Sequence, residues 1–501
     1  MNKQTSPPRD FFSTAHLQAD LKGHTVRGGV ATLGAQGFGL ILSIASIAVL
    51  ARLLTPADFG LIAMATALTG ILALFKDAGL SMATIQREKV THEQVSTIFW
   101  VNVALSLALA LTVAALAPAV SWFYDEPKLF SITLAVAGLF IFDGLAVQHQ
   151  ALLSRQMRFS VLAKIQIVTS SLALVAAITA ALMGAGYWAL LVQLAVSQIS
   201  GMVLSWGYCR WIPGWPQRGV GTRSMLKFGG YLTGFGFVNY FARNADNILI
   251  GKVWGSSELG LYTKAYGLLL FPIQQVNGPI SAVAIPALSR LQNDPEGFRD
   301  FFRKVLSVVT FISFPLIAWM IVCRHEIIML VLGSQWEGAV PIFGILALSA
   351  FFQPIGNITG LLYVVLGRTE RMFKWGLMGC SWLVLSIVVG LPYGPIGVAY
   401  AYSSAIALMI LPCILYAISG TFLRLNDFYD GIKFPVISTI FIFIIGIVTK
   451  FFFEKYIASW LMLGLLSFAM FFSYILISYK LNPNLLRQAF QIMTRKGLKV
   501  A

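Results

Sequence analysis

A run of polar residues interrupts an otherwise apolar stretch near the middle of the chain. Asn239, Arg243, Asn244, Asp246 and Asn247 place five polar groups within nine residues. On a helix, Asn239, Arg243 and Asp246 share one face, because residues three and four apart are neighbours. A guanidinium fork holds two oxygen atoms of an anion, and asparagine amides bond hydroxyl groups. These residue types suit the reversible binding of a polar ligand.

The plainer reading of this run is structural. Arg243 and Asp246, three positions apart, could form an internal ion pair that only holds the helix together. A charge buried in hydrocarbon costs about 2.5 to 3.5 kcal/mol on membrane-insertion scales, so the guanidinium needs a wet cavity, a ligand or this carboxylate. The sequence leaves both readings open. Arg243 is the first candidate for contact with an anion.

Three further cations are candidate cavity residues. Lys252 and Lys264 follow the polar run and could form a second cationic station toward the outer mouth of a cavity, although either lysine could instead extend to the lipid headgroups. Arg52 ends the first apolar stretch and falls on Lys252 when the chain is shifted by 200 residues.

Three carboxylates lie in or at the end of apolar stretches and are ion-coupling candidates. Asp143 and Asp246 stand inside such stretches, and intramembrane carboxylates are natural coupling points for a proton or sodium gradient. Asp77 follows Lys76, and a local ion pair is the plainer role for it. No cofactor is expected, and the sequence does not choose between H+ and Na+.

The elements that must position these groups are membrane helices. Hydrophobic residues make up 57% of the chain and charged residues only 11%, with a mean hydropathy of +0.78. Soluble domains carry roughly 25% charged residues. A helix needs about 20 mostly apolar residues to cross a bilayer, where every backbone group must be satisfied internally. We therefore predict an all-α polytopic membrane protein.

About fourteen transmembrane helices are expected, in a block of six and a block of eight. Tight turns at Gly184–Gly186 and Pro392–Pro395 separate two closely spaced pairs. The expected spans are 28–50, 58–80, 95–119, 129–150, 161–184, 186–209, 228–252, 260–288, 304–323, 338–366, 371–391, 394–419, 432–453 and 457–479. The predicted parts are a cytoplasmic segment at 1–27, an N-lobe at 28–209, a cytoplasmic linker at 210–227, a C-lobe at 228–419, two final spans at 432–479 and an amphipathic cytoplasmic tail at 480–501.

Positive charge predicts the orientation. With the N-terminus inside, the cytoplasmic segments and helix ends hold 27 of the 36 Lys and Arg residues, and the outer side holds six. Cytoplasmic loops of membrane proteins are enriched in Lys and Arg, so both termini are expected in the cytoplasm. The same bias accounts for the net charge of +16. No nucleic-acid partner is expected.

The sequence offers little for covalent chemistry. It contains no nucleophile elbow, phosphate-binding glycine loop or HExxH, and no connection long enough for a catalytic domain outside the membrane. We expect no enzyme and no metal site. Four cysteines lack paired spacing and are expected as free thiols. The five histidines, at 16, 24, 92, 149 and 325, are expected on the ordinary polar surface.

The chain also repeats itself weakly. A shift of 200 residues places Gly34 on Gly234, Asp58 on Glu258, and Gly60 on Gly260. Six spans separate the copies, so the lobes should share an orientation and be related by an axis along the membrane normal. Small residues are common here, and generic helix packing is the alternative. We expect two pseudo-symmetric lobes of six helices each, followed by two C-terminal helices.

Three motifs point to a family. The stretch from Arg243 to Gly251, with Glu258–Tyr262 and Pro286–Arg290, resembles the polysaccharide transporter family of lipid-linked oligosaccharide flippases. Ala51–Leu61 resembles the family's join between its first two helices. The resemblance covers nearly the whole chain and looks closest to colanic acid exporters and related lipopolysaccharide biosynthesis proteins. The superfamily also includes multidrug and toxin extrusion antiporters and lipid II flippases.

The resemblance implies a specific activity. The protein would carry an undecaprenyl-diphosphate-linked oligosaccharide across the bacterial inner membrane by alternating access, for exopolysaccharide, capsule or O-antigen synthesis. Arg243 would then hold the pyrophosphate, while Asn239, Asn244 and Asn247 bond the sugars. The resemblance also implies membrane lipids as partners. It leaves open whether a polysaccharide polymerase is a further partner. A multidrug antiporter is the alternative function; such antiporters usually have twelve spans.

Overall fold

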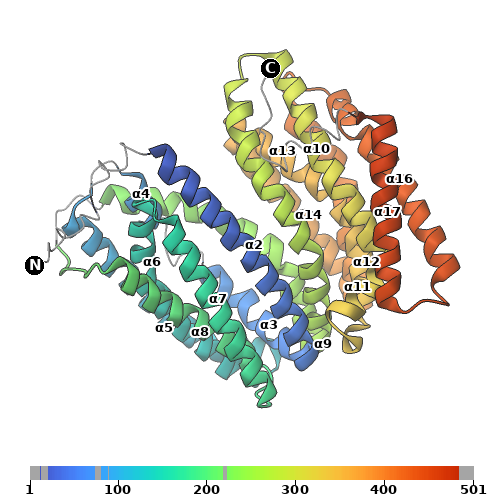
Figure 1. Cartoon of the computed structure of the whole chain (residues 1–501). Coiled ribbons are helices and arrows are strands. Elements are labelled where there is room, and N and C mark those ends of the chain that lie inside the picture. Colours follow the sequence, from blue (N-terminus) through green and yellow to red (C-terminus); the bar gives the residue numbers. More distant parts are fainter. Residues whose placement is uncertain (1–11, 13–20, 74–79, 88–89, 218–222, 484–501) are drawn as a thin grey trace, which may run out of the picture. The chain divides into compact units, whose positions relative to one another are not determined.

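The computed structural model describes residues 12, 21–73, 80–87, 90–217 and 223–483. These residues form α-helices and two short 3-10 helices, with no strand among them. The all-α prediction is confirmed (Figure 1). The helices are α2 (Leu21–Leu53), α3 (Pro56–Ala73), α4 (Leu80–Gln86), α5 (His92–Tyr124), α6 (Lys128–Arg155), α7 (Phe159–Leu182), α8 (Trp188–Cys209), α9 (Arg223–Arg290), α10 (Pro295–Val322), α11 (Arg324–Val331), η1 (Ser334–Trp336), α12 (Ala339–Ala350), α13 (Gln353–Val365), α14 (Thr369–Gly390), η2 (Leu391–Tyr393), α15 (Gly394–Ile418), α16 (Leu425–Phe453) and α17 (Ser459–Leu481).

By length and composition, the described residues hold ten helices able to cross a membrane. The number is eleven if Ala339–Ala350 and Gln353–Val365, which meet at a bend of 41°, count as one span. The predicted span 58–80 corresponds to the shorter apolar helix Pro56–Leu72 and then enters residues outside the described part. The count of fourteen therefore stays a prediction.

Two long apolar segments each include residues of two predicted spans. Asn244–Arg290 is interrupted at Gly255, whose φ of 81° lies outside the helical region, and Thr369–Ile418 is interrupted before Gly394, whose φ is 75°. Glycine adopts positive φ without the steric cost that a Cβ atom brings. The turn predicted at Pro392–Pro395 is confirmed, as is the one at Gly184–Gly186, where both glycines have positive φ.

The chain forms two compact units, Met1–Ser257 and Glu258–Ala501. In the first unit, α5 pairs with α6, α7 pairs with α8, and α2 packs along α7 (Figure 1). A buried cluster that includes Phe99, Leu152 and Trp211 joins α5 and α6 to the residues after α8. The boundary between the two compact units lies after Ser257 and so follows the seventh predicted span, 228–252. The lobe boundary predicted at 210–227 rests on the sequence repeat and stays a prediction.

The second unit is built around α10. This helix packs against α16, and residues such as Phe298, Phe302 and Leu306 are buried in a cluster shared with α13 and the start of α16. At its N-terminal end, Arg303 donates to the carboxylate of Asp427 at 2.8 Å through Nε. Aromatic burial and a charge-assisted bond thus hold this pair of helices together.

The two units share backbone features at a constant separation. Residues with positive φ recur 210 positions apart, in three pairs: Met157 with Gly367, Gly184 with Gly394, and Arg210 with Gly420. These positions precede a helix, divide a helical hairpin and end it. The hairpins α7–α8 and α14–α15 therefore correspond at an offset of 210 residues. The repeat predicted from sequence has an offset of 200 residues, so the pseudo-symmetry of two six-helix lobes stays a prediction.

Corresponding arginines close the two hairpins. Arg158 precedes α7 and donates to the carbonyl oxygen of Tyr208 at 3.3 Å, while Arg368 precedes α14 and donates to that of Ser419 at 2.8 Å. The last carbonyls of a helix have no partner within it, so each guanidinium satisfies an acceptor at the end of the returning helix. Arginines that the sequence shows only as loop charges thus have structural roles.

Candidate functional site

The described part of the polar run on α9 forms a short ladder. Asn244 donates through Nδ2 to the carbonyl oxygen of Tyr240 at 3.0 Å, and Asn247 donates through Nδ2 to Asn244 Oδ1 at 3.5 Å. The two amides therefore follow one another along a single helix face. Asn247 Oδ1 is buried and has no hydrogen-bond partner among the described residues. It is an acceptor that a bound hydroxyl group or water could satisfy.

Asp246 faces a different environment. Its side chain is only 3% exposed, and Oδ1 accepts a hydrogen bond from the backbone N–H of Asn247 at 2.8 Å. A carboxylate so deeply buried must be neutralised by a proton, a cation or further hydrogen bonds. This placement keeps Asp246 as an ion-coupling candidate. The side chains of Asn239 and Arg243 lie outside the described residues, so the predicted Arg243–Asp246 pair stays a prediction.

Helix α3 holds this part of α9 in place. Tyr240 Oη lies 2.8 Å from the carbonyl oxygen of Thr66 and 3.1 Å from that of Ala67, a shared donation that crosses between the two helices. Further along, a Cβ atom on Gly60 would lie 1.7 Å from the carbonyl oxygen of Ser256. The two contacts show that α3 runs antiparallel to α9 between Tyr240 and Ser256, and the close approach at Ser256 requires glycine at position 60.

None of the contacts described for the predicted cations involves the ladder of Asn244 and Asn247. Lys252 is exposed, and its ammonium sits 5.4 Å from the ring centroid of Phe123 at the end of α5. Such a cation–π contact suits an interfacial lysine as well as a cavity one. Arg52 is exposed in the last turn of α2, and Lys264 is half-buried after Gly255.

Of the two other predicted carboxylates, Asp143 is half-buried on α6, next to Gly144. Asp77, with its neighbour Lys76, lies outside the described residues. The structure therefore brings Asn244, Asp246 and Asn247 together and leaves the other predicted site residues unassigned.

Sequence reasoning missed a buried polar cluster between α4, α5 and α6. Thr84 donates to Gln148 Oε1 at 3.1 Å, and both side chains are fully buried. Asn102 is also fully buried, and its amide nitrogen and oxygen have no partner among the described residues. A Cβ atom on Gly144 would lie 2.4 Å from Ser106 Oγ, so this glycine lets α6 approach α5. The signal in the sequence was a set of amides in spans otherwise made of apolar residues.

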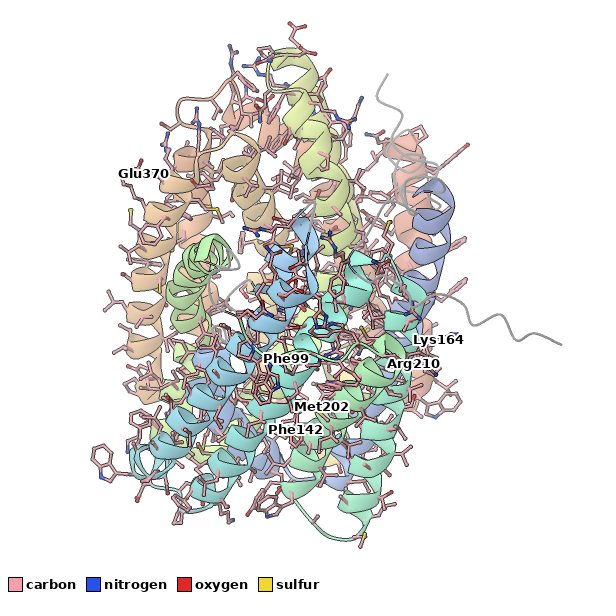
Figure 2. The ribbon with its side chains drawn as sticks, turned by 90° about the vertical axis from the view of Figure 1, so that its left-hand side faces the viewer. Phe99, Phe142, Lys164, Met202, Arg210 and Glu370 are labelled. Atoms are coloured by element: carbon pink, nitrogen blue, oxygen red, sulfur yellow. The ribbon has the colours of Figure 1, made fainter. Side chains whose placement is uncertain are left out.

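The expectation that His149 lies on the ordinary polar surface is wrong. Its side chain is fully buried, its Nε2 lies 3.1 Å from the carbonyl oxygen of Trp211, and its ring stacks on Trp206 at 4.2 Å between centroids. The surrounding indoles cover it, and sequence spacing does not show such a tertiary contact. Phe99 of α5 packs at the edge of the same rings (Figure 2).

The first half of the predicted linker is tied to the start of α5. The backbone N–H of Gly214 donates to Ser96 Oγ at 2.9 Å, and Trp100 Nε1 donates to the carbonyl oxygen of Gly214 at 2.9 Å. Arg210 caps the C-terminal end of α8 and lies at the same end of the α7–α8 hairpin as Lys164 of α7 (Figure 2). Residues 210–217 are therefore a docked strap rather than a free connection.

Comparison with known proteins identifies the family. A family model described as polysaccharide biosynthesis protein matches residues 49–341, more than half of the chain. The chain belongs to the polysaccharide biosynthesis protein family. This family member is similar to the lipopolysaccharide biosynthesis protein WzxC of Escherichia coli (strain K12), with 26% identity over 72% of this chain and 73% of that protein. It is also 26% identical to the teichuronic acid biosynthesis protein TuaB of Bacillus subtilis (strain 168), over 80% of this chain and 83% of that protein.

Solved structures show which fold this family member has. The lipid II flippase MurJ, in an inward closed conformation, matches with a TM-score of 0.72 at 15% identity, over 91% of this chain and all of that one. An inward-facing multidrug resistance MATE family transporter matches with a TM-score of 0.61 at 12% identity, over 78% of this chain and 97% of that one. At these identities the likeness concerns the fold alone. The family member is thus a multi-pass helical membrane protein with the fold that these two structures share.

Proposed function

We propose that this protein moves undecaprenyl-diphosphate-linked oligosaccharide repeat units across the inner membrane of a bacterium, for the synthesis of an exopolysaccharide, capsule or O-antigen. The observation that carries the proposal is the family match over residues 49–341. Relatives are named for the biosynthesis of three different glycans, lipopolysaccharide, teichuronic acid and succinoglycan, and the last of them is named a transport protein. Under this proposal, the step common to these syntheses would be the passage of a lipid-linked precursor.

The residues support binding and release rather than covalent chemistry. The amides of Asn244 and Asn247 lie on one helix face, and the Asn247 carbonyl oxygen has an unused hydrogen-bonding capacity among the described residues. Sugar hydroxyl groups are donors and acceptors of matching strength. Arg243, on the same helix, would supply the fork for pyrophosphate. Asp246, buried beside it in sequence, would exchange a proton or sodium ion during the cycle.

The cycle would alternate access between the two sides of the membrane, with the lipid tail remaining in the bilayer. Both termini would lie in the cytoplasm, as the charge asymmetry predicts. No bond of the glycan needs to break. A polysaccharide polymerase would take over the cargo on the outer side.

The decisive experiment is transport by the purified protein. The full chain is reconstituted into vesicles that contain a defined undecaprenyl-diphosphate glycan on one leaflet, and arrival on the other leaflet is followed with a membrane-impermeant lectin. We expect protein-dependent arrival. The matched control is the same vesicle with a cationic dye as cargo, because a multidrug antiporter would carry the dye against a proton gradient. Dye transport without glycan arrival would overturn the proposal.

A further inference from the structure

A cavity of about 560 Å³ lies within the second compact unit, where the end of α10, the start of α11 and the end of α16 meet. Ligand-binding cavities in proteins typically measure about 300 to 1,000 Å³. Its walls combine apolar side chains, including Ile447 and Phe451, with the charged side chains of Arg324, Lys450 and Glu454. All the described residues that line it lie between Ile321 and Glu454 in the sequence. The cavity therefore belongs to a different site from the one proposed for the cargo.

Lys450 is a fixed part of the cavity. Its ammonium lies 2.8 Å from a carboxylate oxygen of Glu326 and donates to the carbonyl oxygen of Val322 at 3.2 Å. Glu326 is nearly fully buried, so this ion pair satisfies a carboxylate that would otherwise be costly. The positive charge of Lys450 is thus already balanced by Glu326.

Two charges remain for an occupant. Arg324 is exposed and has no carboxylate within ion-pair distance in the part of the chain that the structure describes. Its stem crosses Gly344, where a Cβ atom would lie 2.7 Å from Arg324 Cδ, so the neighbouring helix holds it in position. Glu454 is exposed and lies 3.8 Å from Lys450, which Glu326 already neutralises. The cavity, which the ring of His325 also lines, therefore presents Glu454 and the guanidinium of Arg324, whose Nη1 donates to the carbonyl oxygen of Ile321 at 3.3 Å.

The apolar part of the cavity faces outward from the protein. Phe451 is 79% exposed and Ile447 is 49% exposed, both on a helix long and apolar enough to cross a membrane. Such side chains belong in hydrocarbon or at its boundary. An occupant of this cavity would come from the bilayer, with its polar end against Arg324 and Glu454 and its apolar part along α16.

We propose that this cavity binds a zwitterionic phospholipid whose headgroup carries a primary ammonium, the chemistry of phosphatidylethanolamine. The phosphate takes the guanidinium fork of Arg324, and the ammonium donates hydrogen bonds to Glu454. The acyl chains follow Ile447 and Phe451. A purely anionic headgroup leaves Glu454 opposed to a like charge, and a quaternary choline ammonium has no hydrogen to donate.

The test compares three phospholipids with the same acyl chains and ethanolamine, choline or glycerol headgroups. The purified full chain in detergent is titrated with each lipid, and binding is followed by native mass spectrometry and by the thermal unfolding midpoint. We expect the ethanolamine lipid to bind about tenfold more tightly than the choline lipid. Glu454→Gln should remove that preference, and Arg324→Gln should weaken the binding of all three lipids about tenfold. Lys455→Gln, a neighbouring exposed charge outside the cavity lining, is the matched control and should change nothing.

Other outcomes overturn the proposal. Equal binding of the ethanolamine and choline lipids would mean that the apolar wall alone holds lipid. Tightest binding of the glycerol lipid would make the cavity a plain cationic site. A preference that survives Glu454→Gln would remove the ammonium contact. Glu454→Asp keeps the charge and should retain part of the preference. This variant separates the loss of the charge in Glu454→Gln from a local disturbance of Lys450.

Discussion

The hydroxyl group of Tyr240 lies so close to α3 that a Cβ atom on Gly70 would sit 2.3 Å from it. The same hydroxyl bonds the carbonyl oxygens of Thr66 and Ala67. One side chain of α9 thus fills the space above a glycine of α3 and satisfies carbonyls of the turn before it. This contact sits one helical turn from Asn244 and fixes the position of the polar ladder.

Gly70→Ala should lower the free energy of unfolding by about 1 to 3 kcal/mol, because an overpacked contact forces the helices apart. Tyr240→Phe alone should cost about 1 kcal/mol for the lost hydrogen bond. The double variant should cost less than the two changes added together, since phenylalanine removes the atom that clashes. Thermal unfolding measures all three. Gly138→Ala, where the new Cβ has no neighbour within 4 Å, is the control; purely additive effects would show that the contact does not form.

Arg243→Ala should reduce glycan export per inserted molecule about tenfold or more, because a charge-assisted hydrogen bond to a ligand is worth roughly 1.5 to 3 kcal/mol. Arg243→Lys should restore only part of it, since lysine keeps the charge but loses the fork. Export is normalised to membrane-inserted protein.

The ion-pair reading of Arg243 predicts a different pattern. Arg243→Ala would then mainly lower protein abundance, and adding Asp246→Ala would recover both abundance and export. Near-normal export per molecule by Arg243→Ala would remove this residue from the binding site.

A cysteine introduced at Arg218 should react only with reagents that enter the cytoplasm. The physical reason is the excess of Lys and Arg in the segments assigned to that side. Three native cysteines are buried and Cys380 is half-buried, so a Cys380→Ser background gives a low blank. Labelling from the outside would contradict the predicted orientation.

Asn102→Leu should raise the thermal unfolding midpoint, because the buried amide of Asn102 has no partner among the described residues. Such an amide costs about 1 to 3 kcal/mol, and leucine has a similar size. Thr84→Val is the matched control: it removes the bond to Gln148 and should lower stability by about 1 kcal/mol. A large loss of stability in Asn102→Leu would mean that its amide has partners in the folded membrane protein, such as ordered water.

The sequence predicts helices better than it predicts what their polar groups touch. Apolar length dictates membrane helices, and glycine with proline marks their turns, so the breaks at Gly184 and Gly394 could be placed in advance. The burial of His149 under Trp206 and the donation from Arg155 to the carbonyl of Thr84 could not, because both depend on residues more than fifty positions away. The polar run on α9 was visible as polarity in an apolar stretch. Its ladder follows from helix periodicity, whereas its anchoring to α3 required coordinates.

The matching turns of the two units have a consequence for how such a chain tolerates change. From Met157 to Arg210 there are as many residues as from Gly367 to Gly420, and the glycines Gly184 and Gly394 divide both stretches at the same point. Adding one residue to either helix would rotate every later side chain by about 100° around the axis, since a turn takes 3.6 residues. Arg158 or Arg368 would then no longer meet its carbonyl on the returning helix. Natural selection should therefore eliminate single-residue insertions in these hairpins. Exchange of one entire hairpin for the other would keep each side chain at its original angle around the helix axis.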